Sequence, residues 1–275
     1  MSKGILLFAV GEEYIRQAYL CALSIKATGN NTPVSLFTDK EVENKNDVFD
    51  QIVVDKWPVY DASRYQVLNR WKTYHYSPYD ETIVIDADTL VLQDITDWWK
   101  FFGNYELFFP TNVYTYRNVV LTSDYYRKAF IVNRLPNIYT GIHYFKKCDK
   151  SHLFFKWLEL ISNNWELFYG NFCKEHYPNA PSMDLSTSIA IKILELDQEV
   201  TNTRIQFLKF VHMKLYAQEW QTLRTTKWID QVGIYLNHNL NLVIGNYTQT
   251  GIFHYVENEF VTDDIIKAYE KKVLG

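Results

Sequence analysis

The segment ETIVIDADTLVLQD, residues 81–94, constrains the fold of this chain more than any other feature. Its apolar run Ile83 to Ile85 predicts a buried strand, and the carboxylates of Asp86 and Asp88 follow at once, separated by one residue. In an extended backbone, residues i and i+2 project from the same face, so both carboxylates can reach one point beyond the strand. A hard divalent cation such as Mg²⁺ or Mn²⁺ takes oxygen ligands and keeps positions open for water or a substrate phosphate. The pair therefore predicts a metal site, and an Asp-rich turn after a buried strand is the alternative.

The composition favours a large folded core. Of the 275 residues, 47% are hydrophobic and 17% are aromatic, which is enough to fill a core and to line clefts with rings. Apolar runs such as residues 5–10 are far shorter than the roughly 20 residues that cross a bilayer, and the N-terminus lacks a signal-peptide pattern. We therefore expect a soluble, cytoplasmic protein with no membrane span.

Cysteine content and net charge bear on two further classes of protein: those stabilised by disulfides or zinc, and those that bind nucleic acids. Cys21, Cys148 and Cys173 are odd in number and far apart, so they indicate neither a disulfide framework nor a zinc cluster, and we expect reduced thiols. The formal net charge of -4 at pH 7 gives no overall attraction to a nucleic-acid backbone. A local basic patch remains compatible with that charge.

In the first 100 residues, apolar runs of strand length alternate with helical patterns. This alternation predicts an α/β fold with a mostly parallel sheet covered by helices on both faces. In such sheets ligands bind beyond the carboxyl ends of the strands, which is where Gly11, Asp39 and the Asp86/Asp88 pair fall. The predicted strands are residues 4–10, 34–38, 51–54 and 83–85, and the predicted helices are residues 12–27 and 66–76.

The second half of the chain is less regular and richer in aromatic residues. Its helix from residue 184 is expected to be capped by Asp184 itself or by Ser182. The predicted strands are residues 105–110, 138–145, 241–244 and 251–256, and the predicted helices are residues 152–164, 184–195 and 263–273.

With these residues in view, the chain resembles the GT-A glycosyltransferases of the glycogenin and bacterial lipopolysaccharide galactosyltransferase group. The block YDETIVIDADTLVLQD, residues 79–94, is similar to the DxD strand of that family, and also to predicted glycosyltransferases of large tailed phages. The resemblance implies one GT-A (Rossmann-like) domain over residues 1–275, with a nucleotide-binding half at 1–100 and an acceptor half at 101–275. It also implies that Asp86 and Asp88 bind manganese and the diphosphate of the donor.

A third metal ligand is implied near the C-terminus. The family has a histidine in an HF-x-G context, and GIFHYVEN places His254 at that position. A neutral imidazole is a normal manganese ligand. The sequence departs from the family pattern after the histidine, where Glu257 and its neighbours replace the glycine and lysine. His212 in FVHMK is the rival ligand, and Lys214 beside it could supply the missing positive charge to the donor.

The resemblance also implies a donor site at the N-terminal end. In AVGEEYIRQ, Tyr14 matches a tyrosine that stacks on uracil, and the backbone of Ala9 and Val10 would hold the edge of the base. In NRWKTYHY, Arg70 matches a lysine that contacts the donor sugar, with Lys72 as the neighbouring alternative. Residues two apart on a helix face different directions, so we expect only one of these two cations to enter the cleft, and we favour Arg70.

Two further segments are implied to touch the donor sugar. IYTGIHYF resembles the FNSG strand of the family, which gives Thr140 and Gly141 as neighbours of the sugar, where a glycine allows close backbone approach. SMDLSTS resembles a DQ-containing helix start, which gives Asp184 as a catalytic candidate together with Arg70. Leu185 stands in place of the glutamine.

The implied activity is metal-dependent transfer of a hexosyl or pentosyl group from a nucleotide sugar, a UDP-sugar in the family, to an acceptor hydroxyl with retention of configuration. Aromatic and cationic residues at 114–134 and 209–227 suit sugar rings and equally suit bases and phosphates. The acceptor is therefore a glycan, a lipid-linked sugar or, from the phage-type resemblance, a flipped-out hydroxymethylated pyrimidine in DNA, with the reaction then in the host cytoplasm. Two other classes stay open: a sugar nucleotidyltransferase, which the acidic VGEEYIRQ segment disfavours, and a non-catalytic carbohydrate-binding protein.

Overall fold

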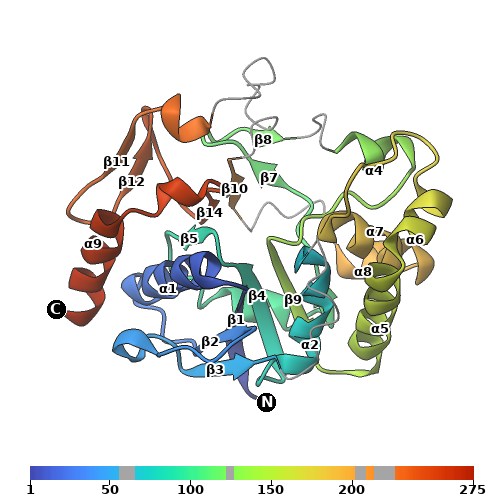
Figure 1. The fold of residues 1–275 in the computed structure, drawn as a ribbon, viewed down its shortest axis with the longest axis horizontal. Coiled ribbons are helices and arrows are strands. Elements are labelled where there is room, and N and C mark those ends of the chain that lie inside the picture. The colour runs from blue at the N-terminus through green and yellow to red at the C-terminus, as the bar shows by residue number, and fades with distance from the viewer. Residues whose placement is uncertain (56–65, 122–126, 202–208, 214–226) are drawn as a thin grey trace.

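A six-stranded mixed sheet forms the centre of the computed structural model, which describes residues 1–55, 66–121, 127–201, 209–213 and 227–275 (Figure 1). Its strands are β1 (Lys3–Ala9), β2 (Val34–Thr38), β3 (Gln51–Val54), β4 (Glu81–Asp86), β6 (Leu107–Phe108) and β9 (Ile142–Lys146). They lie in the order β3-β2-β1-β4-β9-β6. The first four pair in parallel, and β9 runs antiparallel to both of its neighbours. The predicted α/β class with a mostly parallel sheet is confirmed.

Helices cover both faces of this sheet. Ile5 and Leu7 of β1 pack in one apolar cluster with α1 (Glu12–Ala27), whereas Leu6 packs in a second cluster with α5 (Asp149–Asn163) and α7 (Met183–Ile193). Successive residues of a strand point to opposite faces, so each face receives apolar side chains. Burial on both faces explains why the central strands read as continuous apolar runs.

A second sheet holds much of the other half, and the sequence predicted only one of its strands. Its members are β5 (Thr89–Val91), β7 (Val113–Tyr114), β8 (Val120–Leu121), β10 (Phe210–His212) and β14 (Ile252–His254), in the order β5-β14-β10-β7-β8. Strands of two or three residues are too short to show a period of two in the sequence. Because β5 follows β4 after a turn of two residues, the second sheet begins at the carboxyl end of the first.

The remaining elements surround these two sheets. A third, antiparallel sheet consists of β11 (Ile234–Leu236), β12 (Leu242–Ile244) and β13 (Tyr247–Thr248). The other described helices are η1 (Lys45–Asp47), η2 (Gln66–Trp71), α2 (Lys72–Tyr76), α3 (Trp98–Phe102), α4 (Lys128–Val132), α6 (Trp165–Phe172), α8 (Asp197–Val200), η5 (Trp228–Asp230), η6 (Asn258–Phe260) and α9 (Asp263–Leu274).

Several predicted elements differ from the structure in their bounds or in their type. The strand expected at residues 105–110 is only β6, and the one expected at 138–145 begins four residues later as β9, because the backbone of Tyr139 and the side chain of Thr140 bond outside the sheet. The helix expected at 66–76 is a 3₁₀ helix followed by a short α-helix. Ser182, and not Asp184, caps α7, since its hydroxyl accepts from the N–H of Leu185.

None of the helices in the described part of the chain combines the length and the apolar character needed to cross a bilayer. All three cysteines are free thiols, as expected. Burial raises the pKa of Cys21 to about 12 and that of Cys173 to about 11. Both thiols are therefore unreactive in the folded chain.

Candidate active site

The pairing of the second sheet brings a histidine next to the two aspartates. In the antiparallel pairing of β14 with β5, His254 lies opposite Thr89, one residue after Asp88. The N–H of Tyr255 donates to the backbone oxygen of Asp88 at 3.1 Å, which fixes the two segments. As a result, one possible ligand atom from each of Asp86, Asp88 and His254 lies within 4.8 Å of the others.

The donor set fits a divalent cation. Two carboxylates and an imidazole are ligands that Mn²⁺ accepts, and their atoms lie near enough together for all three residues to bind one ion. His254 Nε2 is 2.8 Å from Asp88 Oδ2, with a shared hydrogen that a cation would replace. The guanidinium of Arg70 lies 2.6 Å from Asp86 Oδ1 and would have to share this carboxylate with the ion.

The two carboxylates differ in charge environment although one residue separates them. Burial raises the pKa of Asp86, and the charge of Asp88 raises it further against the opposing effect of Arg70. Burial also acts on Asp88, but the charge and hydrogen bond of His254 outweigh it, so the pKa of Asp88 lies below its usual value. A pair of this kind, a buried and a half-buried acid whose pKa values are shifted in opposite directions, is typical of a functional site.

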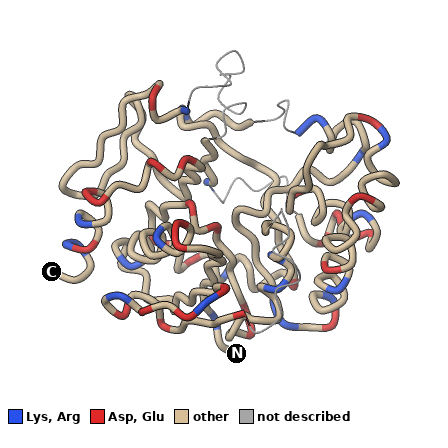
Figure 2. The backbone as a smooth tube through the Cα atoms, in the orientation of Figure 1, with Lys and Arg blue, Asp and Glu red and all other residues tan. Residues whose placement is uncertain are grey.

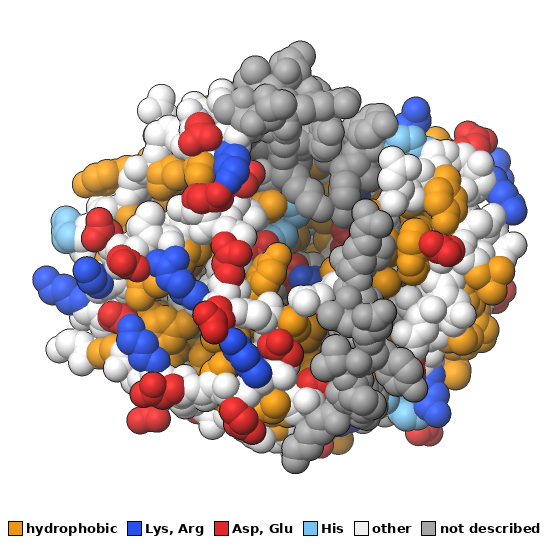
Figure 3. Space-filling view, viewed as in Figure 1, with side chains coloured by type: hydrophobic (Ala, Val, Ile, Leu, Met, Phe, Trp, Pro, Cys, Tyr) orange, Lys and Arg blue, Asp and Glu red, His pale blue; other side chains and the backbone are white. Residues whose placement is uncertain are grey.

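These three residues lie on the floor of a cleft of about 820 Å³. The space-filling view shows the hollow, with histidine and charged side chains inside it (Figure 3). The lining residues come from both halves of the chain: Phe8, Val10, Tyr14, Gln66, Val67, Arg70, Asp86, Ala87, Asp88, Tyr139, Thr140, Gly141, Ala180, Pro181, Ser182, Met183, Asp184, Phe210, His212, His254 and Val256.

The structure brings most of the described site residues that were predicted into this cleft and leaves two of them, Lys72 and Ala9, out. Lys72 forms an ion pair with Asp55 at 2.6 Å instead, so that Arg70 alone of the two cations lines the cleft. Ala9 is buried within β1, next to Val10, which does line the cleft. Lys214 lies outside the described residues.

Two of the residues predicted to hold a base, Val10 and Tyr14, line the cleft. Tyr14 is in the first turn of α1 and is 45% exposed, so its ring is accessible. Gly11, which precedes this helix, has a φ of 84°, and its N–H donates to Asp39 Oδ1 at 3.2 Å. A positive φ favours glycine, and here it turns the chain sharply from β1 into α1.

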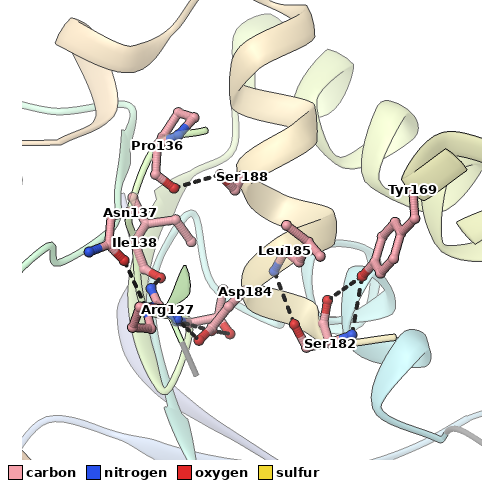
Figure 4. A network of polar contacts seen from close by, with 10 residues as sticks. Arg127, Pro136, Asn137, Ile138, Tyr169, Ser182, Asp184, Leu185 and Ser188 are labelled. Carbon is pink, nitrogen blue, oxygen red and sulfur yellow. Dashed lines mark hydrogen bonds and ion pairs between the residues drawn. The ribbon is translucent and has the colours of Figure 1, made fainter. Parts of the chain in front are cut away.

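A polar network around Arg127 and Asp184 (Figure 4) fixes the wall of the cleft that Asp184 forms with Thr140. Asp184 Oδ1 accepts from the backbone N–H of Thr140 at 2.9 Å and from its hydroxyl at 2.6 Å. Arg127 Nη1 donates to the other oxygen, Oδ2, at 2.7 Å. Gly141 follows, and an added Cβ there would lie 2.6 Å from the ring of Phe210. Packing against this ring is thus the observed reason for the glycine.

Arg127 corrects one expectation. The sequence placed it among the cations of a possible acceptor surface, but it is fully buried, with its guanidinium 3.8 Å from the ring centre of Tyr139 and 4.0 Å from that of Phe130. A cation in an aromatic and basic stretch carries no sequence signal that separates a buried position from an exposed one. The contact with Asp184 depends on the fold alone.

His212, the rival ligand, lies beside His254. In the parallel pairing of β10 with β14 the two residues are opposite each other, and their ring centres are 4.4 Å apart. His212 lines the cleft but is not among the three residues whose ligand atoms cluster.

Val256 lines the cleft in a conformation that a β-branched residue rarely adopts. Its φ is 69°, and the N–H of Glu257 donates across it to the oxygen of Tyr255 at 2.7 Å, as in a γ-turn. Such a residue stores about 1–3 kcal/mol of strain and persists only where the surroundings hold it. The indole N–H of Trp228 holds this turn in place by donating to the backbone oxygen of Tyr255 at 2.7 Å.

Replacing Val256 by glycine is expected to raise the free energy of unfolding by about 1 kcal/mol, because the relieved strain exceeds the added entropy of the unfolded chain. Urea denaturation measures this change. Leu240 also has a positive φ, of 63°, but does not line the cleft, so Leu240→Gly is the matched control. We expect both variants to gain stability and only Val256→Gly to change ligand binding. A loss of stability in Val256→Gly would contradict the assignment of strain.

No protein-family model and no curated protein matches this sequence. Among solved structures, two of the glycosyltransferase GlyE from Streptococcus pneumoniae TIGR4 match at 15% and 14% identity, with TM-scores of 0.39 and 0.48. They cover 74% and 100% of this chain, which spans only 45% and 61% of theirs. A galactosyltransferase, LgtC, solved with donor and acceptor sugar analogues, matches at 11% identity over 98% of this chain and 95% of its own, with a TM-score of 0.52. At this identity the likeness shows the fold, and the chain has the predicted GT-A fold.

Proposed function

We propose that this chain is a metal-dependent glycosyltransferase that moves a sugar from a nucleotide-diphosphate donor, a UDP-sugar in the first instance, to an acceptor hydroxyl. One observation carries the proposal: Asp86 at the end of β4, Asp88 in the turn that follows and His254 in β14 bring their ligand atoms within 4.8 Å of one another, and all three line a large cleft. Its proposed compartment is the cytoplasm.

The roles follow from the positions of the side chains. A Mn²⁺ or Mg²⁺ ion held by this group would act as a Lewis acid and neutralise charge on the departing diphosphate. Tyr14 would stack on the base, and Arg70, which already lies beside Asp86, would bind the donor near the bond that breaks. Thr140 and Gly141 would form the wall against the sugar, with residues 1–100 as the donor half and the rest as the acceptor half.

Retention of configuration is part of the proposal, and the network around Asp184 supports a mechanism without a covalent intermediate. Both of its oxygens already accept hydrogen bonds, from Thr140 and from Arg127. A carboxylate stabilised in this way is a weak nucleophile. We therefore propose that Asp184 orients the wall of the cleft and that the acceptor hydroxyl attacks from the face that the diphosphate leaves.

A glycan is the acceptor that the charges support best. Arg70 is the only Lys or Arg among the described residues that line the cleft, and it is paired with Asp86. Elsewhere on the described backbone, cations and acids are interspersed (Figure 2). A polyanionic acceptor such as DNA would be recognised by a basic track, and duplex binding that weakens steeply with salt would reveal one.

The test is hydrolysis of nucleotide sugars by the purified chain with Mn²⁺ and after treatment with EDTA. We expect slow release of the nucleoside diphosphate with the ion and none without it, together with a rise in melting temperature that requires both ion and donor. Release of pyrophosphate from a nucleoside triphosphate and a sugar phosphate would instead identify a nucleotidyltransferase. Binding without any turnover would identify a carbohydrate-binding protein.

A further inference from the structure

Arg127 is buried and does not line the cleft, and among the described residues its guanidinium donates to three different acceptors. Its Nε donates to Asn137 Oδ1 at 2.7 Å, its Nη2 donates to the backbone oxygen of Ile138, and its Nη1 donates to Asp184 Oδ2 at 2.7 Å. Burying a charge is costly unless it is paired and hydrogen-bonded, and the planar guanidinium meets this condition with bonds in fixed directions. Asp184 is therefore held in one orientation.

From Asp184 the hydrogen bonds continue to the candidate metal ligands. Its Oδ1 accepts the N–H and the hydroxyl of Thr140, so both donors of that residue point toward the carboxylate. His143 Nδ1 lies 3.2 Å from the backbone oxygen of Thr140 and fixes the other side of the peptide. The next carbonyl, that of Gly141, accepts the N–H of Asp86 at 2.9 Å.

We propose that Arg127 is a positioning residue of the site: it acts through Asp184 to hold the Thr140–Gly141 peptide in register with the strand end that carries Asp86. This role rests on the proposed function, because it explains how a loop remote from the donor sets the shape of the sugar-binding wall. Arg127 does not line the cleft, so its effect on a reaction passes through the network of Figure 4.

The network offers a matched control for a purely structural role. Ser188 lies on the same helix as Asp184, is fully buried, and donates to the backbone oxygen of Pro136 at 2.5 Å. It therefore ties α7 to the same loop that contains Asn137 and Ile138, and its hydroxyl donates to that loop rather than to the side chain of Asp184 or Thr140. Ser188→Ala should loosen the loop without altering the peptide at the cleft wall.

The first experiment needs no turnover. Hydrogen–deuterium exchange of the Thr140 amide is compared in the wild type, Arg127→Met and Ser188→Ala. We expect about tenfold faster exchange in Arg127→Met, because Asp184 can then rotate away from the amide, and unchanged exchange in Ser188→Ala. If Arg127→Met does not fold, Asn137→Ala removes one of the three acceptors and should show a smaller change of the same kind.

The second experiment measures donor hydrolysis with Mn²⁺. Arg127→Met should lower kcat about 10- to 100-fold with KM for the donor and the affinity for Mn²⁺ nearly unchanged, because a misplaced wall affects the reacting geometry more than the ion. Arg127→Lys, which keeps the charge without the planar fork, should restore part of kcat. Equal exchange rates in Arg127→Met and the wild type, or equal losses of kcat in Arg127→Met and Ser188→Ala, would overturn the positioning role. A wild type that hydrolyses no nucleotide sugar would defeat the proposed function, and the exchange rates would still decide the role of Arg127.

Discussion

Asp88→Asn is expected to lower metal-dependent turnover at least about 1,000-fold, the largest effect of any single substitution that we anticipate. The amide has nearly the shape of the carboxylate but lacks the negative charge that a divalent cation needs. Asp88 is also the partner of His254 Nε2 at 2.8 Å, so the substitution weakens two of the three donors of the group at once. Donor hydrolysis as a function of Mn²⁺ concentration measures the loss.

The control for this prediction lies in the same segment. Asp94 accepts hydrogen bonds from Thr96 and from Asn30 and does not line the cleft, so Asp94→Asn should leave turnover within about twofold. The fold of Asp88→Asn should also persist without metal, because an amide oxygen at this position can still accept from His254. The metal hypothesis would be wrong if Asp88→Asn kept the rise in melting temperature that Mn²⁺ and donor produce in the wild type.

The first sheet could be predicted from the sequence because its strands and helices are long and strongly patterned. The bounds of α1, β2 and β3 agree with the expectation to the residue. Continuous apolar runs indicate strands buried on both faces, and this is how they lie between the two apolar clusters. The second sheet could not be predicted in the same way, since β7 and β8 have two residues each. Pairing between segments far apart in the chain, rather than local periodicity, defines these strands.

The residues of the candidate site likewise fall into two groups, those that the local sequence predicts and those that only the fold brings together. Asp86 and Asp88 are separated by one residue, so the sequence alone keeps them near each other, although Asp88 lies in the turn after β4 and not in an extended strand as expected. His254 is predicted only through the resemblance to a family motif near the C-terminus. The pairing of β14 with β5 explains why it lies beside Asp88. The choice between Arg70 and Lys72 depends on Asp55, which pairs with Lys72. No local pattern distinguishes Arg127 from the exposed cations around it, because burial of a charge is a property of the folded neighbourhood.

Acidification from pH 7 to pH 5 is expected to lower the free energy of unfolding by about 2 kcal/mol through His143 alone. Burial lowers the pKa of His143 to about 4, against a usual value of about 6.5 in an unfolded chain. Between these two values the unfolded chain binds a proton that the folded chain does not, so stability falls as the pH falls. The stability that depends on a neutral His143 is fully present above about pH 6.5. Below about pH 4 all of it, about 3 kcal/mol, has been lost.

Urea denaturation at both pH values measures this effect, and His143→Gln removes the titrating group. The difference between the two pH values should shrink by about 2 kcal/mol in that variant, whereas His238→Gln, at an exposed turn, should leave it unchanged. An unaltered pH dependence in His143→Gln would show that the imidazole is not held neutral. The neutral form matters for the site as well, because its Nδ1–H tautomer donates to the carbonyl of Thr140 while adding no positive charge behind Arg70. A protonated imidazole at this buried position would repel that guanidinium, and so the loss of stability and the loss of the cleft wall should begin in the same pH range.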